Sequence, residues 1–299
     1  MRSLSRFLGL VPILGLAELL LHQYFAQRAP DLQDYQRLAP ALLELKRLGV
    51  PVVVAPSWAE PLLRQVAPAA FPLAELARPD DSGFTTFLEV SLLGQSAPEL
   101  AGFATKQVQQ LGPFRVALRQ NPRPEPTSFD FVTAVDAGEV EVFLDVDEQL
   151  RPCQRRERTH TSTGGLHGHV AYPRLRHECG GGRFVGVTLI EDQDYRPRRC
   201  ILVQPPEAGA LVLRFTSVPA SRRLVGFAGF SYFLERDIAV DEVELSVAEA
   251  GKALGSYRAA GARGWSRFEL ARGANGSVEV KLRRLLHSAS DFCFALEAR

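Results

Sequence analysis

The fold is decided by the stretch Gly182-Arg-Phe-Val-Gly-Val-Thr-Leu-Ile-Glu-Asp-Gln-Asp-Tyr-Arg-Pro-Arg-Arg-Cys200-Ile-Leu-Val203. It contains an apolar strand pattern, an acidic turn, a basic cluster, a cysteine and a second apolar strand. Short strand patterns separated by glycine and proline turns continue to a second cysteine, Cys293. Many short strands without a helical period are typical of an antiparallel sandwich. We therefore predict a β-sandwich over 183–299, most simply a jelly roll.

Nine strands are expected in this sandwich. Each is a short apolar or alternating run that ends at a glycine, a proline or a polar turn. They are expected at 183–190, 199–204, 210–217, 224–235, 241–248, 253–258, 265–271, 276–285 and 291–298.

The cysteines indicate how this sandwich is stabilised. Four cysteines occur, all in the carboxy-terminal half, and none forms a Cys-x-x-Cys pair. An even number without metal-binding spacing favours two disulfides in an exported protein. Three pairings exist, and we favour Cys153 with Cys179 and Cys200 with Cys293, because the second closes a domain-sized loop. Four free thiols in a reducing compartment are the alternative.

The amino terminus indicates export. A short basic segment, 1–6, precedes the uncharged apolar run 7–17, which is the order of a secretory signal. The run continues to Phe25 through Glu18 and His22, and no small-x-small cleavage site follows it. We expect 1–28 to be an uncleaved signal anchor, or else a signal peptide, with the remaining chain outside the cytosol. A buried amphipathic helix of a cytosolic protein is the alternative.

Residues 29–120 show strand and helix patterns in alternation. Helices are expected at 29–49, 58–66 and 97–111, and strands at 50–56, 84–93 and 114–119. This order predicts a small three-layer α/β unit with a parallel core. A proline-rich segment, 121–126, then begins a region up to 182 that we expect to be a linker and a disulfide-clasped loop. The fold class is therefore α+β: a membrane helix, an α/β unit and a β-sandwich.

Composition excludes one class of partner. The chain has 299 residues, a formal net charge of +1 and 46% hydrophobic residues, which suits one or two packed domains. No basic stripe with interleaved aromatic residues is present, so a nucleic-acid partner is not expected.

Two groups of residues could bind a cation. His167 and His169 form a His-Gly-His step that could place two imidazoles on one metal, although solvated loop histidines are the commoner outcome. Glu191, Asp192 and Asp194 follow a strand and could bind calcium or act as acid and base on a glycoside. They could also simply neutralise the arginines that follow them. No cofactor is expected, with calcium as the alternative.

Another group could bind a glycan or an anion. Arg196, Arg198 and Arg199 surround Pro197 and could hold a phosphate or uronate with forked hydrogen bonds. They could instead bond carbonyl groups at the sandwich edge. Trp265 could stack on a sugar ring if it is exposed, although a buried position is more usual.

Two resemblances add to these patterns. The segment 264–270, with Trp265, and the strands around Ser277 and Cys293 resemble the closing strands of galactose-binding-like jelly rolls, over about a third of the chain. The segments 52–62 and 87–92 are similar to the soluble region of bacterial polytopic sugar transferases that use lipid-linked sugars. This chain lacks their multi-helix membrane body, so that resemblance implies cell-envelope surroundings and no transferase activity.

Together these patterns predict a non-catalytic binding or accessory protein of the cell envelope. We expect it to be anchored in the inner membrane, with its bulk outside the cytosol. Its partner would be an envelope glycan or a glycan-handling membrane protein. A glycoside-active enzyme using the carboxylates of 191–194, and a purely structural interaction protein, are the alternatives.

Overall fold

The structure is a computed structural model that describes residues 10–28, 30–47, 49–158, 172–192, 196–230, 242–260, 264–286 and 292–299. For 10, 11, 22 and 24–28 it describes the backbone alone. The chain divides into two compact units. Unit 1 comprises 1–71 and 86–120, and unit 2 comprises 72–85 and 121–299. The chain therefore enters unit 2 briefly before it completes unit 1.

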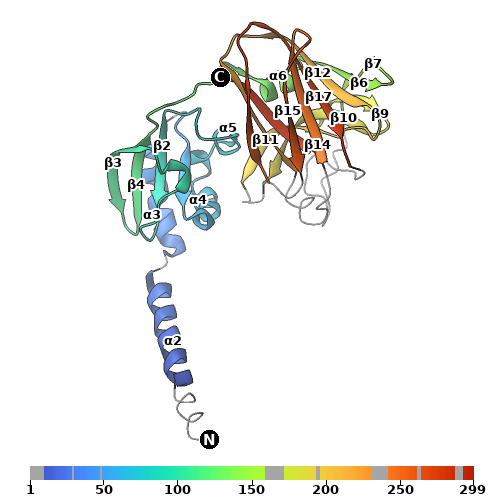
Figure 1. The fold of residues 1–299 in the computed structure, drawn as a ribbon. Helices are drawn as coiled ribbons and strands as arrows, with labels where there is room; N and C mark the ends of the chain where they lie inside the picture. The colour runs from blue at the N-terminus through green and yellow to red at the C-terminus, as the bar shows by residue number, and fades with distance from the viewer. Residues whose placement is uncertain are drawn as a thin grey trace, which may run out of the picture. The chain divides into compact units, whose positions relative to one another are not determined.

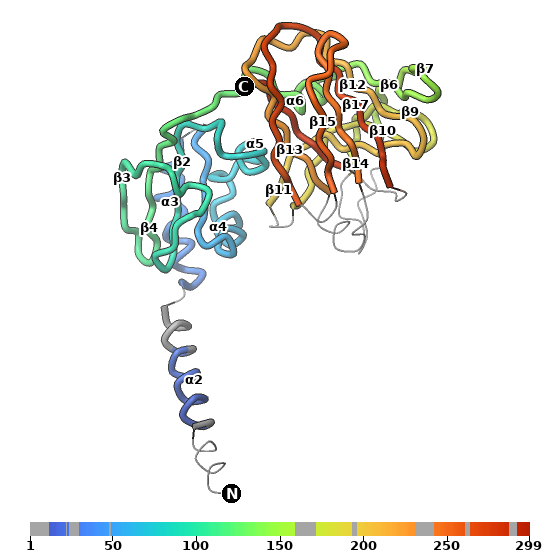
Figure 2. Tube along the Cα trace, viewed as in Figure 1, coloured from blue at the N-terminus to red at the C-terminus, as the bar shows by residue number. Residues whose placement is uncertain are grey.

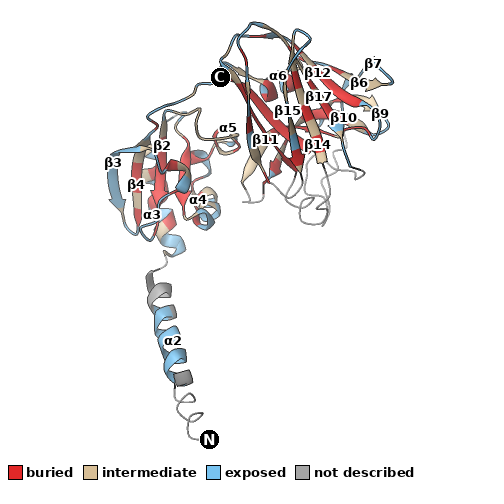
Figure 3. Cartoon of the chain, viewed as in Figure 1, coloured by how far each residue is buried: buried red, intermediate tan, exposed pale blue. Residues whose placement is uncertain are grey.

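The first helix, α2 (Leu10–Arg28), is mostly apolar in sequence. Large apolar side chains along it are more than half exposed, and they are coloured pale blue in Figure 3: Ile13, Leu14, Leu16, Leu19, Leu20 and Leu21. No helix in the described part of the chain is both long enough and apolar enough to cross a membrane. The membrane span that we expected over 1–28 is therefore not supported.

The rest of unit 1 packs helices against a four-stranded sheet (Figure 1). Helix α3 (Leu32–Leu45) begins at a capping box, in which Asp31 accepts a hydrogen bond from the backbone N–H of Asp34. Strand order is β1-β2-β4-β3. The elements are α3, β1 (Val52–Ala55), η1 (Ser57–Ala59), α4 (Glu60–Val66), η2 (Pro68–Ala70), β2 (Thr86–Ser91), η3 (Pro98–Leu100), β3 (Ala104–Leu111) and β4 (Phe114–Gln120).

Two expectations for unit 1 are wrong. The helix expected at 97–111 is a short 3-10 turn followed by β3, which forms a hairpin with β4. Its residues are mostly polar and lie exposed at the sheet edge, so they give no strand-like burial pattern. The core is also not wholly parallel, because β1 and β2 are parallel but β2, β4 and β3 run antiparallel.

Unit 2 is a β-sandwich of two antiparallel sheets, whose path is traced in Figure 2. One sheet has the order β16-β13-β18-β11-β10-β9-β8 with β5 beside β18, and the other has the order β15-β14-β17-β12-β6-β7. Helices α5 (Leu73–Leu76) and α6 (Phe131–Ala137) belong to the same unit. The strands before β10 are β5 (Phe129–Asp130), β6 (Glu141–Val146), β7 (Gln149–Pro152), β8 (Gln154–Glu157) and β9 (Leu175–Gly180).

The nine strands expected from residue 183 onward are confirmed where the structure describes them, with ends within two residues. They are β10 (Arg183–Glu191), β11 (Pro197–Val203), β12 (Ala210–Val218), β13 (Arg223–Phe230), β14 (Glu242–Glu249), β15 (Lys252–Ala260), β16 (Ser266–Ala271), β17 (Gly276–Arg284) and β18 (Phe292–Ala298). Residues 231–235, 241 and 291 of those expectations lie outside the described part.

The region 121–182 is more than the expected linker. Its alternating run Glu141–Val146 is β6, which pairs with β12 inside the second sheet. Strands β8 and β9 extend the first sheet beside β10. The sandwich therefore begins before residue 183, because these short strands complete the two sheets.

The burial of the strands in the core explains why their apolar patterns were visible in the sequence. Ile201 and Val203 of β11 face the core between the sheets, and Cys200 and Leu202 face a smaller apolar cluster on the other side. The strand is buried on both faces, so it appears in the sequence as a continuous apolar run. Both predicted disulfides are present, Cys153–Cys179 and Cys200–Cys293.

Candidate functional site

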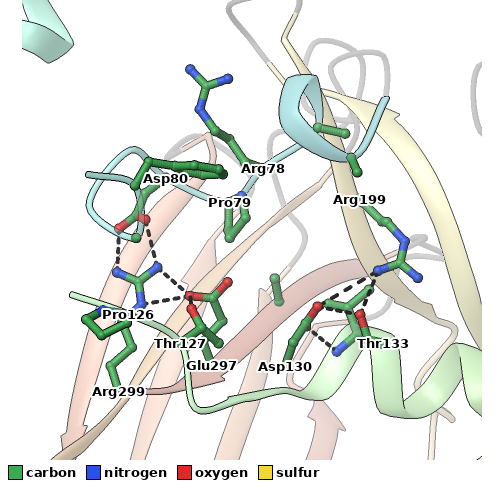
Figure 4. Close-up of a pocket in the computed structure, with 16 residues that line it drawn as sticks. Arg78, Pro79, Asp80, Pro126, Thr127, Asp130, Thr133, Arg199, Glu297 and Arg299 are labelled. Carbon is green, nitrogen blue, oxygen red and sulfur yellow. Dashed lines mark hydrogen bonds and ion pairs between the residues drawn. The ribbon is translucent and has the colours of Figure 1, made fainter. Parts of the chain in front are cut away.

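A cavity of about 400 Å³ lies within unit 2 and is drawn in Figure 4. Four stretches of chain line it: the segment 74–84, the segment 126–133, Arg199 of β11 and the end of β18. Its charged lining residues are Arg78, Asp80, Asp130, Arg199, Glu297 and Arg299. Its larger apolar lining residues are Pro79, Phe84, Pro126 and Val132.

Arg299 joins two of the carboxylates. Its Nη2 and Nη1 donate to the two carboxylate oxygens of Asp80 at 2.7 and 3.1 Å, and its Nε donates to Glu297 Oε2 at 2.7 Å. Further hydrogen bonds reach Ser82 and Glu297. The Arg299 side chain is 3% exposed. All five N–H donors of the guanidinium are therefore used, in the charge-assisted fork that arginine favours.

Glu297 and Asp80 differ in their environment. Burial raises the pKa of Glu297 above its ordinary value, against the opposing effects of Arg299 and Thr127. Burial also acts to raise the pKa of Asp80, but the hydrogen bonds and charge of Arg299, with Ser82 and Arg267, together lower it. Glu297 Oε2 accepts from Thr127 Oγ1 at 2.9 Å, whereas Oε1 accepts no hydrogen bond from any described residue. One carboxylate oxygen is thus left for another donor.

The other side of the cavity is a helix start. Asp130 caps α6, accepting from the backbone N–H of Val132 at 2.9 Å and from Thr133 Oγ1 at 2.5 Å. Arg199 donates to Thr133 Oγ1 at 3.2 Å and to Asp136 at 2.7 Å. These contacts fix the side chains of Asp130, Thr133 and Arg199, as Figure 4 shows.

Two of the predicted anion ligands, Arg198 and Arg199, hold the segment 72–85 on the sandwich. Arg198 Nη1 donates to the carbonyl oxygens of Arg78 and Pro79 at 2.9 and 3.1 Å. The backbone N–H of Arg199 donates to the carbonyl of Ala77 at 3.0 Å. The Arg198 guanidinium thus follows the alternative that we considered, bonding to carbonyl groups at the sandwich edge, whereas the Arg199 guanidinium bonds to Thr133 and Asp136. Arg199 also lines the cavity.

In the acidic turn, Asp192 forms an ion pair with Arg198. Asp192 is 4% exposed and accepts from Arg198 Nε at 2.8 Å and from the backbone N–H of Arg196 at 2.9 Å. Glu191 is exposed. Asp194 lies outside the described residues. Within the described part, no three His, Cys, Asp or Glu side chains group as metal ligands.

Two further predictions concern a histidine pair and a sugar platform. His167 and His169 lie outside the described residues. Trp265 is partly buried, stacks on Phe227 with ring centroids 6.3 Å apart, and packs against both apolar clusters. Its position is therefore in the core, which was the more usual outcome.

Most residues of the cavity were not predicted from the sequence. Arg78, Asp80, Asp130, Glu297 and Arg299 were not singled out in the sequence. These residues are far apart in the chain and meet only through the pairing of β5 with β18 and the return of 72–85. The local signal in the sequence was the density of charged residues at 78–81.

Known proteins resemble this chain only weakly. No protein-family model matches the chain, and no curated protein matches it. A CBM51 module of a GH95 protein from Clostridium perfringens, solved with methyl-galactose, is 9% identical, with a TM-score of 0.29 over 38% of this chain and 81% of that one.

Two further solved structures are similar. The tandem CBM51 modules of a family 98 glycoside hydrolase from Streptococcus pneumoniae are 12% identical, with a TM-score of 0.31 over 62% of this chain and 55% of that one. TmCBM61, solved with β-1,4-galactotriose, is 13% identical, with a TM-score of 0.26 over 38% of this chain and 82% of that one. The neighbours are carbohydrate-binding modules, but TM-scores this low carry no argument about the ligand of this chain.

Proposed function

We propose that this protein is a non-catalytic, extracytoplasmic glycan-binding protein that takes a neutral sugar in the cavity beside Arg299. The observation that carries the proposal is the charge balance of that cavity. Three guanidinium groups and three carboxylates line it, and they are largely paired with one another. A charged ligand would have to break these pairs, whereas sugar hydroxyl groups can donate to and accept from them without doing so.

The shape of the lining supports the same class of ligand. Phe84, Pro79 and Pro126 add apolar surface to a lining that also carries fixed polar groups. A pyranose has an apolar face of C–H groups and a rim of hydroxyl groups, so it can use both. The volume of about 400 Å³ lies within the range of small-molecule sites.

Binding fits the arrangement better than catalysis. Glycoside hydrolysis needs two carboxyl groups on either side of the scissile bond, one of them free to transfer a proton. Here Arg299 lies between Asp80 and Glu297 and bonds to both. Asp130 is committed to capping α6. The carboxylates can therefore accept hydrogen bonds from a ligand more readily than they can act on it.

One observation favours a second candidate, a glycoside hydrolase that uses the Asp80 and Glu297 pair. Their pKa values shift in opposite directions, as in acid and base pairs of such enzymes. If this candidate holds, the protein hydrolyses aryl glycosides and Glu297→Gln abolishes the activity. Binding without hydrolysis supports the first proposal.

The extracytoplasmic location rests on the two disulfides, because such bonds persist in oxidising compartments. Intact-mass analysis of the native protein should find no free thiol. Four free thiols would contradict the location. Membrane attachment through 1–28 and a glycan-handling partner stay predictions, which cell fractionation and cross-linking can test.

The binding proposal is tested by a glycan array followed by calorimetric titration. Gly83 lines the cavity, and a Cβ added there would lie 3.8 Å from the nearest atom, so a larger side chain can enter without a backbone clash. We expect Gly83→Leu to weaken binding of the selected neutral sugar at least about tenfold, by occupying the site. Gly273→Leu is the control, because Gly273 is exposed and has open space around it. Equal affinity in both variants would refute this cavity as the site.

A further inference from the structure

A second cavity in unit 2 has the opposite electrostatic character. Its volume is about 280 Å³, and it is lined by Arg183, Gln204, Arg284 and Glu207, with Gly181 and two prolines completing the wall. The turn before β10, the segment after β11 and the end of β17 form it. It shares no lining residue with the cavity beside Arg299.

Arg284 is buried at this cavity without adequate partners. Its side chain is 10% exposed, and its buried Nε has no hydrogen-bond partner among the described residues. Its nearest carboxylate oxygen, on Glu207, is 3.9 Å from Nη1, which is beyond hydrogen-bond distance. A buried guanidinium with unpaired N–H groups is costly, so the site favours any ligand that supplies oxygen acceptors.

Arg183 brings a second guanidinium to the same wall. It follows a tight turn in which Gly180, Gly181 and Gly182 all have positive φ, at 82°, 59° and 79°. Only glycine adopts these angles without strain. The guanidinium lies over Gly181, where an added Cβ would be 3.4 Å from Nη1. No hydrogen bond or ion pair joins the Arg183 side chain to another residue of the described part.

The charges of this cavity are not balanced. Two arginines face one carboxylate, Glu207, whose side chain is 78% exposed and therefore well solvated. Guanidinium groups bind oxyanions through paired N–H donors, which a carboxylate, a phosphate or a sulfate group can accept. We propose that Arg183 and Arg284 form an anion-binding site for such a group. This site does not depend on the proposed sugar site.

Two sources could supply the anion: an acidic group on a sugar, or a free inorganic ion. The shared chemistry is a group with at least two acceptor oxygens. Titrations of the full chain with inorganic phosphate and with galacturonate separate the sources. Tighter binding of galacturonate indicates an acidic glycan, and tighter binding of phosphate indicates a free anion or a phosphate ester.

The decisive comparison uses two adjacent arginines. Arg284→Gln should weaken binding of the tighter of the two probes about tenfold or more, because charge-assisted hydrogen bonds are lost. Arg283 is exposed, so Arg283→Gln removes the same charge and should change affinity less than about twofold. Glu207→Gln should tighten binding roughly threefold, by removing the competing charge.

The proposal is overturned if neither probe binds, or if Arg284→Gln and Arg283→Gln bind alike. Thermal unfolding verifies that each variant folds. If Arg284→Gln does not fold, Arg183→Gln carries the test, since Arg183 makes no described pair whose loss would unfold the sandwich. Gly83→Leu should leave phosphate binding unchanged, so failure of the sugar site and failure of the anion site are distinguishable.

Discussion

The two cavities of the sandwich are both lined by arginine, yet they place it in opposite circumstances. Beside Glu297, Arg299 uses all its N–H donors on Asp80, Ser82 and Glu297. In the other cavity, Arg284 is buried with an unpaired Nε. The comparison teaches that the ligand preference of an arginine site is set by the carboxylates around it. A neutralised cavity suits hydroxyl groups, and an arginine-rich one suits an anion.

The largest expected difference is in stability. Arg299→Ala would leave Glu297 buried without its counter-charge and Asp80 with only Arg267, 3.7 Å away, which should lower the free energy of unfolding by about 3–5 kcal/mol. Arg284→Gln removes no ion pair of hydrogen-bonding length and should cost less than about 1 kcal/mol. Chemical denaturation measures both. Equal losses would contradict the distinction between the two arginines.

Salt should separate the two ligands next. Raising the NaCl concentration from about 0.05 to about 0.5 M should weaken anion binding at Arg183 and Arg284 several-fold, because salt screens their charges. The neutral sugar should lose almost no affinity over the same range, since its hydrogen bonds carry no net charge. A salt-sensitive sugar affinity would show that the charge balance beside Arg299 is not what determines its ligand.

A smaller effect is expected at Thr127. Its Oγ1 donates to Glu297 Oε2 at 2.9 Å. Thr127→Val keeps the shape and removes the donor, so the free energy of unfolding should fall by about 1 kcal/mol. Thr127→Ser keeps the hydroxyl group and serves as the matched control. If the wild type and both variants are equally stable, this hydrogen bond does not contribute to stability.

The smallest effect concerns pH. The folded-state pKa of Glu297 is raised by burial, so the folded protein holds the proton more tightly than the unfolded chain. The contribution of Glu297 to stability is therefore full below its unfolded pKa and is lost as the pH rises through the folded pKa. The stability of the wild type relative to Glu297→Gln should fall over that interval. A rise would contradict the sign of the shift.

Asp80 should show the opposite dependence. Arg299, Ser82 and Arg267 outweigh burial and lower its pKa, so its contribution is present above the unfolded pKa. The contribution is lost as the pH falls through the folded value. Comparing the wild type with Asp80→Asn at acidic pH checks this, and an advantage of the wild type that grows on acidification would contradict it.

Sequence patterns predicted the sandwich well because its strands are buried. The second half of strand β11, Cys200-Ile-Leu-Val203, is apolar throughout, since both of its faces are covered. The disulfide pairing followed from spacing alone. Strand β3 was missed because it lies exposed at a sheet edge, where nothing imposes an apolar alternation. Burial is therefore what made an element predictable.

The site residues were harder to predict for a different reason. Arg198 and Arg199 looked like free cations beside Pro197, but their partners are the carbonyl groups of 77–79 and the side chains of Thr133 and Asp136, distant in sequence. Arg284 was not singled out in the sequence, and only the burial of its side chain marks it. Whether a charge is paired depends on tertiary contacts, which one sequence does not contain.

The central claim is that the cavity beside Arg299 binds a neutral sugar and that the Arg284 cavity does not. Backbone amide chemical shifts of the full chain, followed while the array-selected oligosaccharide is titrated, test it most directly. We expect shifts at Phe84, Thr127 and Thr133 and none at Arg183 or Arg284. Shifts confined to the surroundings of Arg183 and Arg284, or to neither cavity, would contradict the account.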